Sequence, residues 1–97
     1  MTLRRIATLL DSTLDSDSSV EKVAFDSRQV SAGDLFFALD GDRVDGHAFI
    51  VDAEKRGAVA AVVKRGYANS ELTLPLIHVE DPLAALSLLA RERIKEL

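Results

Sequence analysis

Two uninterrupted apolar runs, residues 35–39 (LFFAL) and 58–63 (AVAAVV), constrain the fold of this chain more than any other feature. Apolar runs of strand length without polar alternation are typical of strands that are covered on both faces, as in the parallel sheets of α/β proteins. Between them, residues 47–56 place Phe49, Ile50 and Ala53 on one helical face, and Gly57 suits the end of that helix. This strand–helix–strand order predicts a layered α/β domain.

The remaining segments extend this pattern. Residues 2–10 and 81–97 carry apolar side chains at helical spacing, and Asp81 and Pro82 suit the start of the second helix. Residues 20–25 and 76–79 read as strands, and polar loops fill 11–19 and 64–74. We therefore predict one domain over residues 1–97, with a small mixed sheet flanked by about three helices. Because the last helix runs to the final residue, we expect the chain to belong to a larger protein.

Composition argues against several functional classes. The net charge is −4 and the basic residues are scattered, which disfavours a nucleic-acid partner. The chain has no cysteine, and no apolar stretch approaches the roughly 20 residues of a membrane span, so we expect a cytoplasmic protein without membrane insertion. His47 and His78 lack ligand-like spacing, and we expect no metal site. His78 is expected to be a hydrogen-bonded strand residue and His47 a helix-entry residue.

No complete catalytic constellation or phosphate-binding loop is present, so we expect no catalytic residue in this chain. Two segments nevertheless have ligand-site chemistry. The first is Phe25-Asp26-Ser27-Arg28, which follows a strand, where α/β sheets place ligand contacts. The Ser27 hydroxyl and the planar donor fork of Arg28 suit a uracil carbonyl or a phosphate. The alternative is an Asx-type turn with an exposed arginine.

The second segment is residues 41–47 (GDRVDGH), between a buried strand and a helix. Its two glycines allow a ligand to approach the backbone closely, and the N–H groups of the following helix favour an anion. Arg43 could add a charge-assisted hydrogen bond. The alternative is a connection that needs glycine for its geometry alone.

Taken together, residues 25–65 resemble the amino-terminal signature of the Mur ligases that act late on UDP-N-acetylmuramoyl-peptides. No single tripeptide is diagnostic, but the ordered set is, and the resemblance covers nearly the whole chain. The matching positions are Asp26-Ser27-Arg28, Val30, Gly33-Asp34, Leu35-Phe36, Ala38-Leu39, Gly41, Asp45-Gly46-His47, Phe49-Ile50, Ala53, Gly57-Ala58, Ala60 and Val62-Val63. Val79-Glu80-Asp81, Leu86 and Leu89-Ala90 also fit the last helix of that domain.

The resemblance implies a function. In Mur ligases this domain holds the UDP part of the substrate, a central domain uses ATP and Mg²⁺, and a carboxy-terminal domain brings the incoming amino acid or dipeptide. This chain would then bind UDP-N-acetylmuramoyl-peptide, need no cofactor of its own, and not catalyse alone, because the central and carboxy-terminal domains are absent from it. By motif, the UDP-contacting residues would be Phe25, Ser27, Arg28, Asp42, Arg43, Val44, Gly46 and His47.

Within the family, two specificities share this signature. Residues 90–95 lack an aromatic side chain, which favours the ligases that add D-alanyl-D-alanine over those that add diaminopimelate or lysine. A reading from a different class is a non-catalytic protein-interaction module that uses the acidic loop 11–19 and the last helix. Binding of UDP would separate the two classes, because a specific ligand stabilises the fold by mass action.

Overall fold

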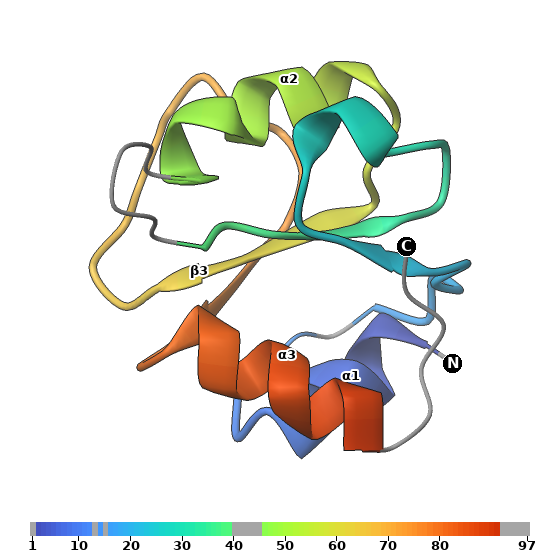
Figure 1. Cartoon of the computed structure of the whole chain (residues 1–97), viewed down its shortest axis with the longest axis vertical. Helices are drawn as coiled ribbons and strands as arrows, with labels where there is room; N and C mark the ends of the chain where they lie inside the picture. Colours follow the sequence, from blue (N-terminus) through green and yellow to red (C-terminus); the bar gives the residue numbers. More distant parts are fainter. Residues whose placement is uncertain (1, 13, 15, 40–45, 92–97) are drawn as a thin grey trace.

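The structure is a computed structural model that describes residues 2–12, 14, 16–39 and 46–91. Over these residues, helices lie on both faces of one sheet (Figure 1). The helices are α1 (Leu3–Leu9), α2 (Ile50–Lys55) and α3 (Pro82–Arg91), with two short 3₁₀ helices, η1 (Ser27–Gln29) and η2 (Gly46–Phe49). The strands are β1 (Val23–Ala24), β2 (Leu35–Phe37), β3 (Ala60–Lys64) and β4 (Leu76–Val79).

The four described strands form a sheet of order β1-β2-β3-β4, and each of its pairings is parallel. The predicted α/β class is confirmed. The sheet was expected to be mixed, but antiparallel pairing within the described residues is confined to an isolated bridge between Thr2 and Ser19, outside the sheet. The reason is that each connection crosses a face of the sheet, through η1, α2 or the loop of residues 65–75, and crossovers of this kind join parallel strands.

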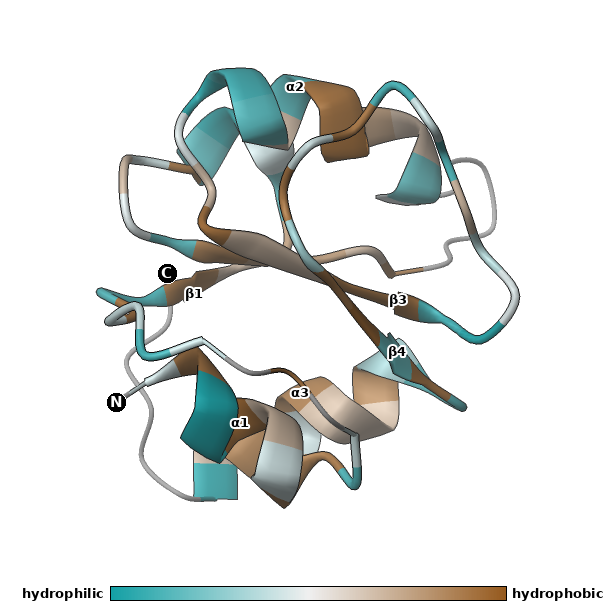
Figure 2. Cartoon of the chain, turned by 180° about the vertical axis from the view of Figure 1, so that it is seen from behind, coloured by the Kyte–Doolittle hydropathy of each residue, from teal (hydrophilic) through white to brown (hydrophobic). Residues whose placement is uncertain are grey.

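The sheet divides the core into two layers. Helix α2 and η1 cover one face and α1 and α3 cover the other, with the most apolar residues of the strands between them (Figures 1 and 2). Side chains alternate as strand geometry requires, so that Leu35 and Phe37 face α1 and α3 while Phe36 faces α2. Because both faces are covered, β2 is buried throughout, as its apolar run predicts.

Several element boundaries differ from the sequence prediction. The strand expected over residues 20–25 pairs only at Val23 and Ala24, because Asp26 turns the chain into η1. The helix expected over residues 47–56 begins as η2 and becomes α-helical at Ile50. The last helix is described to Arg91, and the predicted residues 92–97 lie outside the described part of the chain.

At the amino edge of the sheet, the buried carboxylate of Asp34 forms an ion pair with the partly exposed Lys22. Asp34, with no exposed surface, lies 2.8 Å from the ammonium group of Lys22 and accepts a 2.8 Å hydrogen bond from the Ser31 N–H. Buried carboxylates require such partners, since a lone buried charge is strongly destabilising. None of the helices within residues 2–12, 14, 16–39 and 46–91 has both the length and the apolar character of a membrane span.

Candidate functional site at the carboxyl edge of the sheet

Parallel strands bring their carboxyl ends to one edge, and this edge is where α/β sheets place ligands. Phe25 follows β1, Leu39 comes shortly after β2, and Lys64 ends β3. Neighbouring strands lie about 4.8 Å apart, and the register places Lys64, the last residue of β3, three residues beyond the level of Ala24, so the ends of β1 and β3 are separated by roughly 14 Å. The fold therefore gathers the two segments singled out in the sequence at the same edge.

At the end of β1, Asp26 organises the first segment. Its carboxylate accepts a 3.0 Å hydrogen bond from the Arg28 backbone N–H, which caps η1. The same carboxylate takes two bonds from the Arg28 guanidinium, from Nε at 3.1 Å and from Nη2 at 2.8 Å. These bonds to Arg28 lower the pKa of Asp26 to about 2 and raise the pKa of Arg28. The Asx-turn alternative thus describes the local geometry correctly, with Arg28 79% exposed.

The neighbours of this pair differ in exposure. Ser27 is buried, and its backbone carbonyl accepts a 3.2 Å hydrogen bond from the Val30 N–H, which fixes η1. Phe25 is 50% exposed although it is a large apolar side chain. An exposed aromatic ring and an exposed guanidinium therefore both lie at the end of β1. The ring can stack on a nucleotide base, and the guanidinium can donate hydrogen bonds to phosphate oxygens.

The second segment reaches the same edge through Gly46. Its N–H donates a 2.8 Å hydrogen bond to the Leu39 carbonyl, just after β2. A Cβ at this position would lie 2.5 Å from the Leu39 nitrogen and 2.6 Å from the Leu39 oxygen. Glycine is thus required here for close backbone approach. Asp42, Arg43 and Val44 lie outside the described residues.

His47 ties this segment to the end of β3. Its Nε2 accepts a 3.1 Å hydrogen bond from the Lys64 backbone N–H. Its ring lies 4.8 Å from the Tyr67 ring, between centroids, at an interplanar angle of 47°. His47 is in η2, which leads into α2, as expected of a helix-entry residue. One of its ring nitrogens is therefore committed to the backbone of the neighbouring strand.

The sequence interpretation passed over residues that follow β3. Lys64 and Tyr67 were treated as part of a polar loop, yet Lys64 is the last residue of β3 and both lie at the carboxyl edge beside His47. Phe49, 41% exposed, adds a second accessible aromatic side chain near the start of α2. The available signal was position, because these residues directly follow a buried strand in the same way that Phe25 does.

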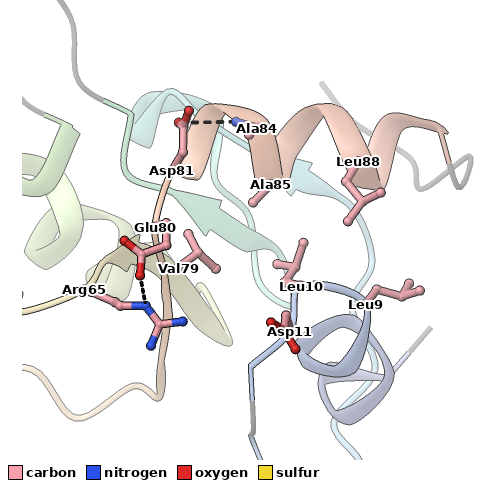
Figure 3. A pocket seen from close by; sticks show the side chains of 10 residues that line it. All are labelled: Leu9, Leu10, Asp11, Arg65, Val79, Glu80, Asp81, Ala84, Ala85 and Leu88. Atoms are coloured by element: carbon pink, nitrogen blue, oxygen red, sulfur yellow. Dashed lines mark hydrogen bonds and ion pairs between the residues drawn. The ribbon is translucent and has the colours of Figure 1, made fainter.

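A separate pocket of about 290 Å³ opens where β4 ends, between α1 and α3 (Figure 3). Its floor is apolar, and its rim carries the 2.5 Å ion pair between Arg65 and Glu80 and the Asp81 carboxylate that caps α3. Its lining residues are Leu9, Leu10, Asp11, Arg65, Val79, Glu80, Asp81, Ala84, Ala85 and Leu88. The described residues of the predicted UDP site are not among them.

The other histidine also has a structural partner. The Nε2 atom of His78 lies 2.9 Å from the Tyr67 backbone carbonyl, which confirms the expected hydrogen-bonded strand histidine. Over residues 2–12, 14, 16–39 and 46–91, no group of three or more His, Cys, Asp or Glu side chains could hold a metal ion. The exposed groups that the described residues place at the end of β1 are the Phe25 ring and the Arg28 guanidinium.

Known proteins show similarity over nearly the whole chain. The family described as "Mur ligase family, catalytic domain" matches residues 19–94. The chain is 41% identical to a UDP-N-acetylmuramoyl-L-alanyl-D-glutamate–2,6-diaminopimelate ligase from Mesorhizobium japonicum, over 93% of this chain and 19% of that protein. It is 36% identical to a UDP-N-acetylmuramoyl-tripeptide–D-alanyl-D-alanine ligase from Haemophilus influenzae, over 90% of this chain and 19% of that protein.

Among solved structures, the chain resembles the MurF ligase from Thermotoga maritima in complex with ADP. The TM-score is 0.64 and the identity 36%, over 76% of this chain and 17% of that protein. This chain therefore spans about a fifth of the length of the proteins that it matches.

Proposed function

Because the chain belongs to the Mur ligase family, we propose that it binds the UDP part of a UDP-N-acetylmuramoyl-peptide at the carboxyl edge of its sheet. The observation that carries this proposal is the meeting of both ligand-like segments at that edge. Phe25, Ser27 and Arg28 follow β1, while Gly46 and His47 join the ends of β2 and β3. Asp42, Arg43 and Val44, between these anchored segments in the sequence, complete the proposed site.

The chemistry of the edge suits a nucleoside diphosphate. Arg28 is exposed; Asp26 holds its guanidinium through Nε and Nη2, and its Nη1 group can donate to phosphate oxygens. The accessible ring of Phe25 offers an apolar face to the uracil base. In this arrangement the binding site needs neither a metal ion nor a cofactor within this chain.

The longer protein that such a domain serves would be a cytoplasmic, ATP-dependent ligase of peptidoglycan precursor synthesis. Residues 1–97 would form its UDP-binding domain, and further domains would supply ATP, Mg²⁺ and the incoming amino acid or dipeptide. The names of the relatives and the ADP in the Thermotoga MurF complex support this role. This chain alone would hold substrate without forming the amide bond.

Separate observations support each of two acceptor specificities. Addition of D-alanyl-D-alanine is favoured by the absence of an aromatic residue in residues 90–95 and by 36% identity to the Thermotoga MurF ligase. Addition of diaminopimelate is favoured by 41% identity to the Mesorhizobium ligase. Assay of the full-length ligase with each acceptor would distinguish them, since only the correct acceptor supports phosphate release.

Calorimetry of the chain with UDP-N-acetylmuramoyl-tripeptide tests the binding proposal. We expect Arg28→Ala to weaken binding about tenfold, as loss of a charge-assisted bond to phosphate predicts. Arg4→Ala is the matched control, because Arg4 is also an exposed, ion-paired arginine but lies on α1 and pairs with Asp17. If the Arg28 variant and the wild type bind the ligand with equal affinity, Arg28 does not contribute to the binding site. Absence of binding in the wild type would contradict the proposed function.

A further inference from the structure

The hydrogen bond at His47 determines the protonation state of its ring. A backbone N–H can only donate, so the Lys64 N–H at 3.1 Å requires a lone pair on Nε2 of His47. A ring with a lone pair on Nε2 is neutral and carries its proton on Nδ1. An imidazolium has a hydrogen on both nitrogens and cannot accept this bond.

The second histidine, His78, bonds to the same loop, but this bond requires a hydrogen on the ring nitrogen instead of a lone pair. A backbone carbonyl can only accept, so Nε2 of His78, 2.9 Å from the Tyr67 oxygen, must carry a hydrogen. That condition is met by the Nε2-protonated neutral ring and also by the imidazolium. The turn from Lys64 to Tyr67 is itself closed by a 3.2 Å bond from the Tyr67 N–H to the Lys64 carbonyl. The two histidines of the chain thus hold one turn by bonds of opposite polarity.

We propose that His47 is a positioning residue whose neutral, Nδ1-protonated ring holds the turn after β3 against the start of η2 and so shapes the carboxyl edge for its ligand. Because its Nε2 is committed to Lys64, His47 acts on the ligand through the backbone it fixes. The effect on binding rests on the proposed function, whereas the ring state and the hold on the turn do not. Protonation of His47 releases the Lys64 N–H, while the bond made by His78 survives protonation.

The elements next to this contact carry few titratable groups among the described residues. At the end of β3 and in the following loop they are Lys64, Arg65 and Tyr67, on β4 the group is His78, and on α2 they are Asp52, Glu54 and Lys55. Arg65 is paired with Glu80, Asp52 with Arg56, and Glu54 is bonded to Thr73. None of these three partnerships involves the His47 ring.

Nitrogen NMR of the ligand-free chain tests the ring states. At about pH 7.5, long-range ¹⁵N–¹H spectra should show His47 as the Nδ1-protonated tautomer and His78 with a proton on Nε2, so each ring is a control for the other. Hydrogen exchange at the Lys64 amide, corrected for its intrinsic rate, should be slowed by the bond to His47. An Nε2-protonated His47, or a Lys64 amide without protection, would overturn the proposal.

Variants test the positioning role. His47→Ala should remove the protection of the Lys64 amide and weaken UDP-N-acetylmuramoyl-tripeptide binding about fivefold, as loss of one hydrogen bond predicts. His47→Gln, whose side-chain oxygen can accept from the Lys64 N–H, should restore most of both properties. Failure of His47→Gln to restore either one would contradict a positioning role. Wild-type protein that shows the expected ring states but binds no ligand would contradict the proposed function alone.

Discussion

At the scale of single residues, the carboxyl edge depends on a few side chains whose identity is fixed by geometry. Gly46 lies so close to Leu39 that any side chain would meet backbone atoms. Asp26 both caps η1 and pairs with Arg28, so one carboxylate sets the local fold and the direction of the guanidinium. Each of these roles makes a separate prediction.

Gly46→Ala should destabilise the domain, because its Cβ would lie 2.5 Å from the Leu39 nitrogen. Overpacking against backbone typically lowers the free energy of unfolding by about 1–3 kcal/mol, and urea denaturation would measure it. Gly66→Ala is the control, since a Cβ there meets nothing within 4 Å and only the left-handed φ of +90° opposes it. That strain costs about 1 kcal/mol. A Gly46 variant no less stable than the Gly66 variant would contradict the close approach.

Asp26 should titrate at unusually low pH. The Arg28 bonds lower its pKa from 3.8 to about 2, so its stabilising contribution is present above about pH 4 and is lost as the pH falls through about 2. Carbon NMR of the Asp26 carboxyl should show this low midpoint, and Arg28→Ala should return the midpoint toward the ordinary aspartate range. A midpoint that does not move in the variant would show that Arg28 is not the cause.

At the scale of elements, the long connection from β3 to β4 is fastened to α2 by one side chain. Glu54 Oε1 accepts bonds from the Thr73 N–H at 2.6 Å, the Thr73 hydroxyl at 2.8 Å and the Leu74 N–H at 2.7 Å. The bonds from Thr73 and Leu74 lower the pKa of Glu54. The helical pattern of residues 47–56 predicts α2, but this contact joins residues about twenty positions apart, which periodicity does not report.

Glu54→Ala should loosen that connection. Hydrogen exchange at the Thr73 and Leu74 amides should accelerate, because their shared acceptor is lost. Glu71→Ala is the matched control, since Glu71 is an exposed carboxylate in the same connection. Equal exchange in the two variants would show that Glu54 does not hold the loop.

Helix α3 offers a second test at this scale, since it has one buried face. Leu89 has no exposed surface and belongs to the core beneath the sheet, whereas Leu83 on the same helix is 60% exposed. Leu89→Ala should lower the free energy of unfolding by about 2–5 kcal/mol, and Leu83→Ala should change it by less than about 0.5 kcal/mol. Similar losses in both variants, by urea denaturation, would contradict the packing of α3.

At the scale of the whole molecule, the parallel sheet brings segments that are far apart in the sequence to one edge, where we propose the ligand site. The apolar runs at residues 35–39 and 58–63 predict buried strands, and those strands are β2 and β3. The same sequence predicts that Phe25 to Arg28 and Gly46 to His47 follow strands. It does not predict that every strand is parallel, because that depends on which face each connection crosses, and β1 is too short to show a pattern.

The sequence also predicts few of the hydrogen bonds at the carboxyl edge. The pattern indicates the Asx turn at Asp26, but it does not indicate that the Arg28 guanidinium also pairs with Asp26 or that His47 accepts from Lys64, since both depend on directions set by the fold. Residues that follow β3 were missed because a polar loop looks the same whether or not it lies beside a site. Family membership, by contrast, was predictable, because ordered motifs over residues 25–65 are specific.

The central claim is that the carboxyl edge of the sheet binds a UDP-sugar, and a ¹⁵N–¹H NMR titration of the chain with UDP-N-acetylmuramoyl-tripeptide tests it most directly. We predict saturable shifts at Ser27, Arg28, Gly46 and His47, with smaller shifts for UMP as the control. Amides around the pocket of Figure 3, such as those of Leu10 and Leu88, should stay unchanged. No shifts at millimolar ligand, or shifts confined to that pocket, would contradict the claim.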